Sequence, residues 1–390
     1  MKKEELIRLR DVYRQTLLRD CLPFWLKYGW DRDDGGIITS LDRDGTVVDS
    51  DKGVWQQGRF AWTLGYAYNT IEKNPTWLAA MESTLAFIGR SCIDQDGRMF
   101  FQVTRQGAPI RKRRYCFSEA FAAMAYGEHC KATGNEESAR MARRLYKVYR
   151  EHIAYPPKNY ATRPVKSLGP FMIQINLCQQ LRESIALDVA TDDIDHCIEE
   201  IRRYFVKDDF KCCMELVGLN GEILDHFDSR LLNPGHTIEG SWFIMAEGHK
   251  RNRADYIELG LRMLDYAWSR GWDEEFGGII YYRDVYNKPI AEYWSDEKFW
   301  WPQNEALIAT LFAWLVTGKE QYAEMYRKVH EYTYHLFPDR EGMDWFGYFS
   351  RDGRRVTDLK GNMYKGCFHM PRQQMVCLEL VDEALHGLKI

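Results

Sequence analysis

The sequence predicts an all-α fold, an (α/α)6 barrel in which six helical hairpins close into a ring and short β-hairpins occupy the connecting loops. Apolar residues recur with the 3.6-residue period of amphipathic helices in twelve segments, and no long strand separates these segments. In addition, one turn sequence occurs twice, far apart in the 390 residues. It reads Gly29-Trp30-Asp31 before Gly35-Gly36-Ile37-Ile38, and again Gly271-Trp272-Asp273 before Gly277-Gly278-Ile279-Ile280.

The twelve helices follow one another in chain order as six hairpins of roughly 65 residues each. Their expected ranges are about 3–28, 54–72, 76–91, 118–133, 136–152, 171–187, 192–206, 236–249, 253–269, 301–317, 320–336 and 371–386. Four prolines stand near expected helix starts, where a missing N–H costs little: Pro75, Pro170, Pro302 and Pro371. Gly134 and Gly318 stand near helix ends, as C-terminal caps do.

The loops between the hairpins contain Gly-Gly, Asp-Gly and Asn-Gly pairs, which suit tight turns that need a positive φ. An open superhelical solenoid is the alternative to a closed ring. The ring is favoured because the first and fifth units share one turn sequence and no polar capping repeat stands at either end. No linker-like composition divides the chain, so we expect one domain over residues 1–390.

Composition excludes several classes of protein. The 53 basic and 57 acidic residues give a net charge of −4 without a long run of either sign, so no nucleic-acid surface is expected. No apolar stretch is long enough to span a membrane. The ten cysteines form no C-x-x-C pair and the charged N-terminus lacks a secretory signal, so we expect free thiols in a cytoplasmic protein. The 14% aromatic content belongs mostly to a large core, and its excess favours a carbohydrate site.

Residues Trp55, Arg59 and Trp62 share one face of an expected helix, because their spacing is i, i+4 and i+7. An arginine between two tryptophans is unusual on a face that should point toward the centre of the ring. We interpret Arg59 as a fixed cation that stabilises a developing oxyanion. The alternative is a surface arginine whose stem covers the aromatic rings.

Two histidines stand at expected helix starts. His236 shares a face with Glu239 in the segment Asn233-Pro234-Gly235-His236-Thr237-Ile238-Glu239. His369 lies two residues before Pro371, the expected first residue of the last helix. Because the positive end of a helix dipole disfavours a charged imidazole, we expect both histidines to be neutral and able to act as general bases. For His236 the alternative is a structural capping role.

Another helix start places Trp301 and Glu305 four residues apart, and the alternative role of Glu305 or Asn304 is N-terminal capping. His236, His369 and Glu305 are of types that bind metals, but no local ligand spacing supports such a site, so we expect no metal. No G-x-G-x-x-G follows a strand, which argues against a dinucleotide cofactor. The loop before His369 contains G-x-x-x-x-G without the Lys-Ser/Thr of a P-loop.

The same segments carry a family resemblance. They are the Trp55-to-Arg59 block, Cys116-Phe117-Ser118-Glu119, the Asn233-to-Glu239 block, the Trp300-to-Ala306 block and Tyr364-Lys365-Gly366-Cys367-Phe368-His369-Met370-Pro371-Arg372. In these blocks the sequence resembles the N-acylglucosamine 2-epimerases, which are described in animals as renin-binding proteins. Related cellobiose 2-epimerases and aldose–ketose isomerases differ in the last block. The resemblance covers nearly the whole chain.

The resemblance implies an (α/α)6 barrel, usually a homodimer, that interconverts N-acetylglucosamine and N-acetylmannosamine. It assigns catalytic roles to His369, His236, Arg59, Glu239 and Glu305. We expect contacts with the amino sugar from Trp55, Asn176, Trp301, Tyr364 and Arg372. Many family members are activated by ATP that is not consumed, and the glycine-rich loop suspected in this effect contains Lys360, Gly361, Lys365 and Gly366.

Two positions depart from the family pattern. Related enzymes place a ring-opening histidine near the position of Asn176, and an asparagine cannot act as an acid or a base. The loop reads Gly361-Asn362-Met363 where Gly-Gly-Pro is expected, which argues against ATP activation in this member.

The residue types agree with a 2-epimerase. In an open-chain sugar the C2 proton lies next to the C1 aldehyde and can leave as an enolate forms. Inversion at C2 needs proton removal on one face and proton return on the other, so His369 and His236 suffice without a redox cofactor. Arg59 would stabilise the enolate oxygen, while Glu239 and Glu305 would orient the histidines or hold hydroxyl groups.

Three other functions stay open. An aldose–ketose isomerase or a 2-epimerase for mannose or another unsubstituted sugar could use the same fold. An inverting glycosidase would need two carboxylates about 6.5–9.5 Å apart across a water, whereas histidines lead here. A partner-binding protein without activity is the third alternative, although it would have no need of acid–base histidines.

Overall fold

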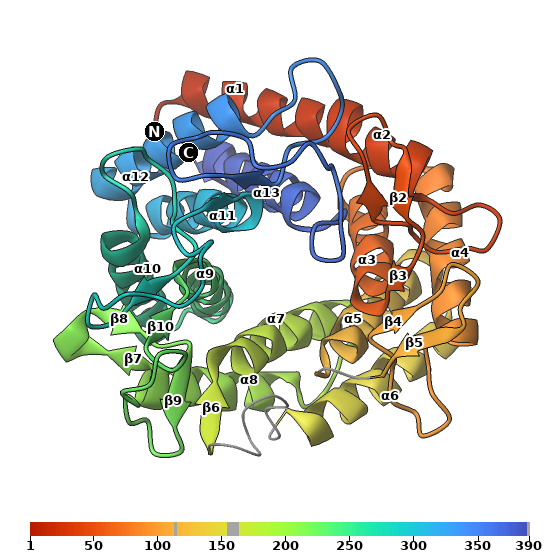
Figure 1. The fold of residues 1–390 in the computed structure, drawn as a ribbon, viewed down its shortest axis with the longest axis horizontal. Helices are drawn as coiled ribbons and strands as arrows, with labels where there is room; N and C mark the ends of the chain where they lie inside the picture. Colours follow the sequence, from red (N-terminus) through yellow and green to blue (C-terminus); the bar gives the residue numbers. More distant parts are fainter. Residues whose placement is uncertain (113–114, 154–163, 388–390) are drawn as a thin grey trace.

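The computed structural model describes residues 1–112, 115–153 and 164–387, and these form a closed ring of helices in two layers (Figure 1). The inner layer consists of α3 (Val54–Thr70), α5 (Phe117–Thr133), α7 (Leu168–Ile185), α9 (Pro234–Arg251), α11 (Trp300–Thr317) and α13 (His369–Gly387). Each inner helix packs against its two neighbours around the ring, and α13 packs against α3, which closes the ring. The predicted (α/α)6 barrel is therefore confirmed and the open solenoid is excluded.

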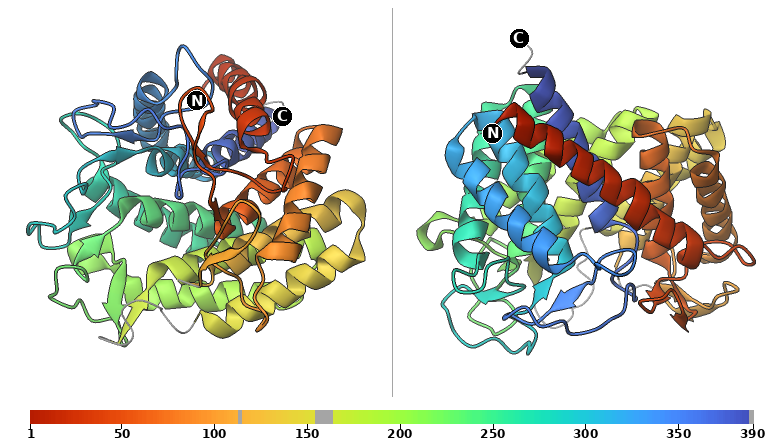
Figure 2. Two further views of the ribbon diagram at one scale, coloured as in Figure 1. Left: turned by 45° about the vertical axis from the view of Figure 1, so that its right-hand side comes forward. Right: turned by 90° about the horizontal axis from the view of Figure 1, so that it is seen from above.

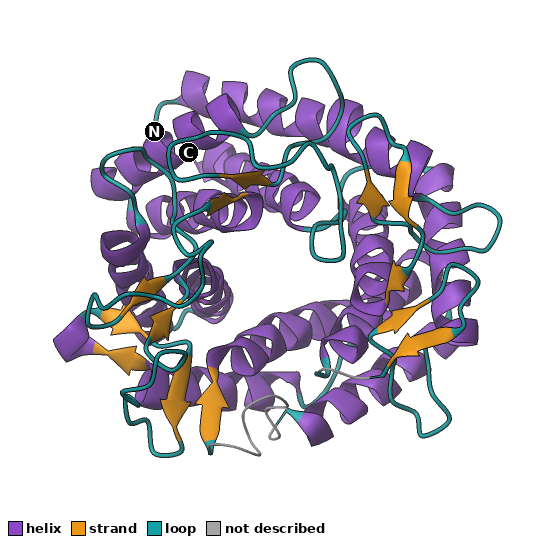
Figure 3. Cartoon of the chain, viewed as in Figure 1, coloured by secondary structure: helices purple, strands orange, loops and turns teal. Residues whose placement is uncertain are grey.

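An outer layer of helices surrounds the inner layer (Figure 3), and the two layers alternate along the chain. It consists of α1 (Lys3–Gln15), α4 (Pro75–Ser91), α6 (Glu136–His152), α8 (Ala190–Glu200), α10 (Ala254–Gly271) and α12 (Glu320–Leu336). The helical path of α1 continues through η1 (Thr16–Cys21), α2 (Leu22–Phe24) and η2 (Trp25–Gly29), and that of α8 continues through η3 (Ile201–Phe205). In the described parts of the chain, no helix combines the length and apolarity needed to cross a membrane.

All twelve expected helices are present, with ends within three residues of the expected ranges, and three of the expected starts at prolines are too late. Helices α7, α11 and α13 begin two residues before Pro170, Pro302 and Pro371, respectively. The first-turn N–H groups of a helix have no intrahelical acceptor, so a proline at the third position costs as little as one at the first. His369 is therefore the first residue of α13 rather than a residue of the preceding loop.

Short strands gather at one end of the ring, where the loops lead into the inner helices (Figure 2). They are β1 (Ser40–Leu41), β2 (Val47–Asp49), β3 (Lys52–Gly53), β4 (Gln102–Val103), β5 (Pro109–Arg111), β6 (Val165–Ser167), β7 (Val206–Lys207), β8 (Cys212–Cys213), β9 (Leu216–Gly218), β10 (Leu231–Leu232), β11 (Arg283–Asp284), β12 (Lys298–Phe299) and β13 (Tyr348–Phe349). Besides the hairpins β1–β2, β4–β5 and β7–β8, the pairs β3–β4, β6–β9, β10–β11 and β12–β13 join one loop to the next. The strands thus hold the loops together at one end of the ring.

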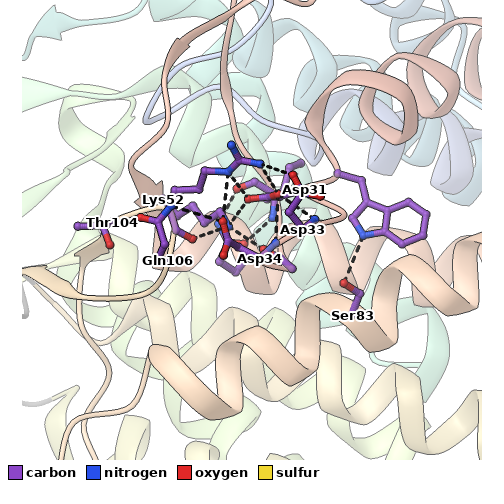
Figure 4. Close-up of polar contacts among 12 residues, drawn as sticks. Asp31, Asp33, Asp34, Lys52, Ser83, Thr104 and Gln106 are labelled. Atoms are coloured by element: carbon purple, nitrogen blue, oxygen red, sulfur yellow. Dashed lines mark hydrogen bonds and ion pairs between the residues drawn. The ribbon is translucent and has the colours of Figure 1, made fainter.

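The repeated turn sequence builds a buried ionic clamp (Figure 4). Asp31 accepts hydrogen bonds from Lys52 Nζ at 2.8 Å and from two nitrogens of Arg105 at 2.8 and 2.9 Å. Lys52 Nζ also donates to the carbonyl oxygens of Gly35 and Arg105. Burial raises the pKa of Asp31, but the hydrogen bonds from Arg105 and Lys52 hold it well below its usual range. The clamp fixes the loop immediately before α3.

Two further copies of this clamp join other loops, and one of them bridges the ring closure. Asp273 pairs with Lys298 at 2.9 Å and with Arg351 of the next loop, and Asp339 pairs with Lys360 at 2.8 Å and with Arg43. Since Arg43 lies in the β1–β2 hairpin and Asp339 in the loop before α13, this last pair joins the first loop of the chain to the last. Four consecutive loops are linked in this way.

Replacing Lys52 with methionine is expected to destabilise the fold by about 3 kcal/mol, because it leaves part of a buried ion pair without its cation. The same effect is expected for Lys298→Met in the second clamp. The measurement is the midpoint of urea unfolding. Lys328→Met, on the exposed face of α12, serves as the control and should shift unfolding by less than about 0.5 kcal/mol. Equal midpoints for the three variants would contradict the clamp.

Candidate active site

A cavity of about 740 Å³ opens at the loop end of the ring, and all six inner helices contribute to its wall. This volume lies within the range of small-molecule sites. Nine of the predicted site residues line the cavity: Trp55, Arg59, Asn176, His236, Glu239, Trp301, Tyr364, His369 and Arg372. Glu305 is fully buried directly behind them. Trp62 does not line this cavity; its Nε1 donates to Gln180 at the opposite end of the ring.

His369 is held in a neutral state at the start of α13. Its side chain is buried, and its Nδ1 atom lies 2.8 Å from Oε1 of Glu305. Because an ionised carboxylate can only accept, Nδ1 carries the proton and Nε2 keeps a lone pair. Burial, together with the cations Arg372 and Arg59, lowers the pKa of His369 well below its ordinary value. A neutral imidazole with a free Nε2 is suited to remove a proton.

His236 has the opposite protonation tendency. Its Nδ1 lies 3.0 Å from Glu215 Oε2, and about a third of the side chain is exposed. Enclosure in the cavity lowers the pKa of His236, but the charge and hydrogen bond of Glu215, with the charge of Glu239, outweigh this effect and raise it. The pKa of His236 therefore shifts opposite to the direction expected from the helix dipole, because a carboxylate in contact has a stronger effect than the dipole.

The capping alternatives for these residues are also excluded. Asn233 caps α9, since its side chain accepts from the His236 backbone N–H at 3.1 Å, while the His236 ring is bonded elsewhere. Glu305 is the sixth residue of α11 and its carboxylate accepts from Trp242 Nε1 at 2.9 Å. Neither His236 nor Glu305 is therefore a cap.

The Trp301 indole contacts both imidazoles. Its ring centre lies 5.1 Å from that of His236 and 5.6 Å from that of His369. The ring packs directly on Gly235, where an added Cβ would lie 2.6 Å from the indole. A glycine at this position allows the indole to stay between the two histidines.

Arg59 is a buried cation without a carboxylate partner in the described part of the chain. Its side chain is 8% exposed, and its guanidinium carbon lies 4.3–4.6 Å from the ring centres of Trp55, Phe121 and Phe368. Burial lowers the pKa of Arg59 to about 10, and Nε has no acceptor. The alternative of a surface arginine is excluded. A desolvated, unpaired guanidinium at a cavity wall is suited to stabilise a negative charge that forms there.

Arg372 forms ion pairs with two carboxylates of the site. Its Nη2 donates to Glu305 at 2.6 Å and also to Glu239. Ligand atoms of Glu239, Glu305 and His369 lie within 4.8 Å of one another, a grouping that could hold a metal ion. The guanidinium already provides a positive charge to both carboxylates, so the arrangement fits an internal ion pair better than a metal centre.

The predicted nucleotide loop has a structural role at the rim of the cavity. Lys360 Nζ donates to Asp339 and to the Asp344 carbonyl, and Lys365 Nζ donates to Asp344 at 2.8 Å. Both lysines are buried, and Gly361 and Gly366 pack closely on neighbouring segments. Neither ammonium group is free to bind a phosphate, so this geometry argues against the predicted role in nucleotide binding. Tyr364, half exposed between them, contacts Trp55.

Glu215 and the apolar part of the cavity could not be identified from the sequence. Glu215 stands between β8 and β9, and it reaches His236 because its backbone is hydrogen-bonded to Leu168 and Leu231 of neighbouring segments. No local sequence pattern marks such a long-range contact. The apolar residues of the wall recur along their helices with the same period as core residues. The sequence therefore does not show that they face a cavity.

Replacing Glu215 with glutamine is expected to lower the pKa of His236, because the neutral amide no longer stabilises the imidazolium. NMR titration of the imidazole carbons in histidine-labelled protein measures this directly. Glu274→Gln, an exposed acid in the loop after α10, is the control and should leave the His236 titration unchanged. An unchanged His236 pKa in Glu215→Gln would contradict the assignment.

Comparison with known proteins gives a consistent result. The family model for N-acylglucosamine 2-epimerase (GlcNAc 2-epimerase) matches residues 35–368. The N-acylglucosamine 2-epimerase of Bos taurus is 32% identical over 405 aligned residues, which cover 99% of this chain and 94% of that protein. The N-acylglucosamine 2-epimerase of Homo sapiens is 33% identical and covers 94% and 88%, respectively. A solved cellobiose 2-epimerase from Spirochaeta thermophila DSM 6192 has the same fold, with a TM-score of 0.85 at 19% identity over 98% of both chains.

Proposed function

Because the chain belongs to the N-acylglucosamine 2-epimerase family, we propose that it interconverts N-acetylglucosamine and N-acetylmannosamine by proton transfer at C2 of the open-chain sugar. The chain is a carbohydrate epimerase, and thus an isomerase. The observation that carries the mechanism is the position of two histidines, each hydrogen-bonded to a carboxylate, in one cavity beside an unpaired arginine. The pKa values of the two histidines shift in opposite directions, which suits one to accept a proton and the other to donate one.

The reaction begins when neutral His369 removes the C2 proton through Nε2. The electron pair of the C2–H bond forms a double bond between C2 and C1, and the C1 carbonyl oxygen becomes an enolate oxygen. The Arg59 guanidinium stabilises this negative charge within the largely buried cavity. The imidazolium of His236 then returns a proton to the other face of C2, which restores the aldehyde with inverted configuration. The roles are exchanged in the reverse direction.

Three charged residues position this pair. Glu305 fixes the His369 tautomer by accepting from Nδ1, and Arg372 holds both Glu305 and Glu239. Glu215 binds Nδ1 of His236 as Glu305 binds Nδ1 of His369. Glu215 has the larger effect on the pKa of its histidine, because Arg372 does not pair with Glu215. Trp55, Trp301 and Tyr364 supply flat faces for the sugar.

The geometry disfavours the glycosidase and the partner-binding protein, and the reaction product distinguishes the isomerase. An inverting glycosidase needs one carboxylic acid and one free carboxylate across a water, whereas Glu239 and Glu305 both bind Arg372. An aldose–ketose isomerase moves the C2 proton to C1, and a 2-acylamido sugar cannot yield a ketose by that route. The paired histidines have no role in a partner-binding protein without activity.

Incubation of N-acetylmannosamine with the protein in D₂O tests the function. The expected result is N-acetylglucosamine that carries one deuterium at C2, detected by NMR and mass spectrometry. Turnover of mannose to a ketose, with no change at C2 of N-acetylmannosamine, would replace the proposal with the isomerase. Release of reducing ends from an oligosaccharide would replace it with the glycosidase.

We also propose that the enzyme is a cytoplasmic homodimer of amino-sugar metabolism that needs no cofactor or metal. The ten cysteines are free thiols, nine of them buried, which fits a reducing compartment. The buried ion pairs of Lys360 and Lys365 favour activity without ATP. Equal rates with and without ATP or EDTA are expected, and light scattering should give twice the chain mass. Dependence on ATP would show that a nucleotide binds elsewhere.

A further inference from the structure

The cavity has two chemically different sides. The ionisable residues described above come from α9, α11 and α13, with Arg59 from α3. Opposite them, α5 and α7 contribute an apolar wall. The residues of this wall are Phe117, Phe121, Met124, Met172 and Ile173. None of these side chains can take part in proton transfer, so this side of the cavity serves another purpose.

One amide interrupts the apolar wall. Asn176 of α7 lies one helical turn beyond Met172 and Ile173, and its side chain is 8% exposed. It lines the cavity and also a second cavity of about 350 Å³ at the opposite end of the ring. Asn176 is therefore placed in the floor between the two cavities.

The Asn176 side chain makes no hydrogen bond to any described residue. The other amide that lines the first cavity, Asn362, is paired with the Tyr348 hydroxyl at 2.9 Å. The buried amides of Gln57 and Gln303 are likewise paired with backbone groups of the loops. Because Asn176 lines the cavity and its carboxamide is not bonded to a described residue, its donor and acceptor are available to a ligand there.

We propose that Asn176 and the apolar wall of α5 and α7 recognise the N-acyl group of the substrate, an inference that rests on the proposed function. A secondary amide has one N–H donor and one carbonyl acceptor, and the Asn176 carboxamide complements both. Nδ2 donates to the acyl carbonyl and Oδ1 accepts from the acyl N–H. The acyl methyl group packs on Met172 and Met124, whose flexible side chains adapt to its shape.

This arrangement selects 2-acylamido sugars over unsubstituted hexoses. A hydroxyl group at C2 could satisfy only part of the Asn176 carboxamide, and it would leave the methionine wall without an apolar partner. The acyl group is also anchored away from the histidines, on the opposite side of the cavity. The site therefore holds C2 by its substituent while the proton is transferred.

Asn176→Leu and Asn176→Asp test this inference. Leucine removes both polar atoms, and aspartate keeps the shape but replaces the donor with a second acceptor. Both variants are expected to lower kcat/KM for N-acetylmannosamine by about 10- to 100-fold, mainly through KM, because a buried polar contact is lost. Mannose, measured as a competitive inhibitor or substrate, should lose much less affinity than N-acetylmannosamine, because its C2 hydroxyl uses only part of the Asn176 carboxamide. Gln180→Leu, one turn further along α7 and lining only the second cavity, should change neither value.

The outcomes separate this inference from the proposed function. Equal losses for N-acetylmannosamine and mannose would show a general structural role for Asn176 and would overturn the inference, as would no loss for either. If the wild-type enzyme fails to exchange the C2 hydrogen of any 2-acylamido sugar, the proposed function itself fails. If the wild-type enzyme exchanges the C2 hydrogen of N-acetylmannosamine but Asn176→Asp keeps the preference for N-acetylmannosamine over mannose, the contact between Asn176 and the acyl group is rejected and the proposed function stands.

Discussion

Replacing His369 or His236 with asparagine should abolish inversion at C2 while leaving hydrogen exchange at C2 in one of the two epimers. Each histidine serves one face, so a single remaining histidine can remove a C2 proton and return deuterium to the same face. Inversion should fall by about 10²- to 10⁴-fold, the usual contribution of a general acid or base. The exchange that remains should concern opposite epimers in the two variants, which assigns each histidine to its face.

The pH dependence of this remaining exchange is a second readout. In His369→Asn the base is His236, whose pKa is raised, so exchange should increase as the pH rises through that pKa. In His236→Asn the base is His369, whose pKa is depressed, so exchange should already be maximal at neutral pH. Deuterium incorporation into N-acetylglucosamine and N-acetylmannosamine, followed separately by NMR, measures both. Full inversion in both variants would refute the pair.

Replacing Arg59 with methionine should lower kcat by about 10²- to 10³-fold, as expected when a donor to a developing oxyanion is removed. The stability should stay the same or rise. Arg59 is a buried cation that contacts three aromatic rings and no described carboxylate, so methionine removes an unpaired charge and keeps the packing. Steady-state kinetics and thermal unfolding of the same preparation test both statements.

Arg372→Met is the matched control for this variant. Arg372 is equally buried, but its guanidinium binds Glu239 and Glu305, so its removal leaves two carboxylates unpaired. Destabilisation of about 3–5 kcal/mol is expected. A loss of stability in Arg59→Met as large as that in Arg372→Met would mean that Arg59 is a structural residue.

Helices and ring closure could be predicted because they depend on local signals. The 3.6-residue period located α3 to α13, and the repeated Gly-Gly turn around Asp31 and Asp273 indicated equivalent units. The loops were harder, since Lys52 and Lys298 show their function only through partners brought together by the fold. A clamp of this kind cannot be distinguished from surface charge in the sequence.

The candidate site was predictable where the residue type itself is unusual for its position. Arg59 between tryptophans and His369 before a helical proline are of this kind, and both lie in the cavity. The protonation of His236 could not be predicted, because it depends on Glu215, a residue from a different loop. The orientation of Lys360 and Lys365 toward buried aspartates was also hidden, since a Gly- and Lys-rich segment equally suits phosphate binding.

The ionic link between Arg43 and Asp339 joins the first loop of the chain to the last, so the ring does not depend on the order in which the chain begins and ends. The first and last helices, α1 and α13, pack against each other (Figure 1), and this link with its two equivalents joins the loops on both sides of the junction. The cyclic order of the hairpins, rather than the place where synthesis starts, therefore defines the architecture. The polypeptide could be circularly permuted, with new termini at the exposed turn around Gly134, without removing a contact from the active site.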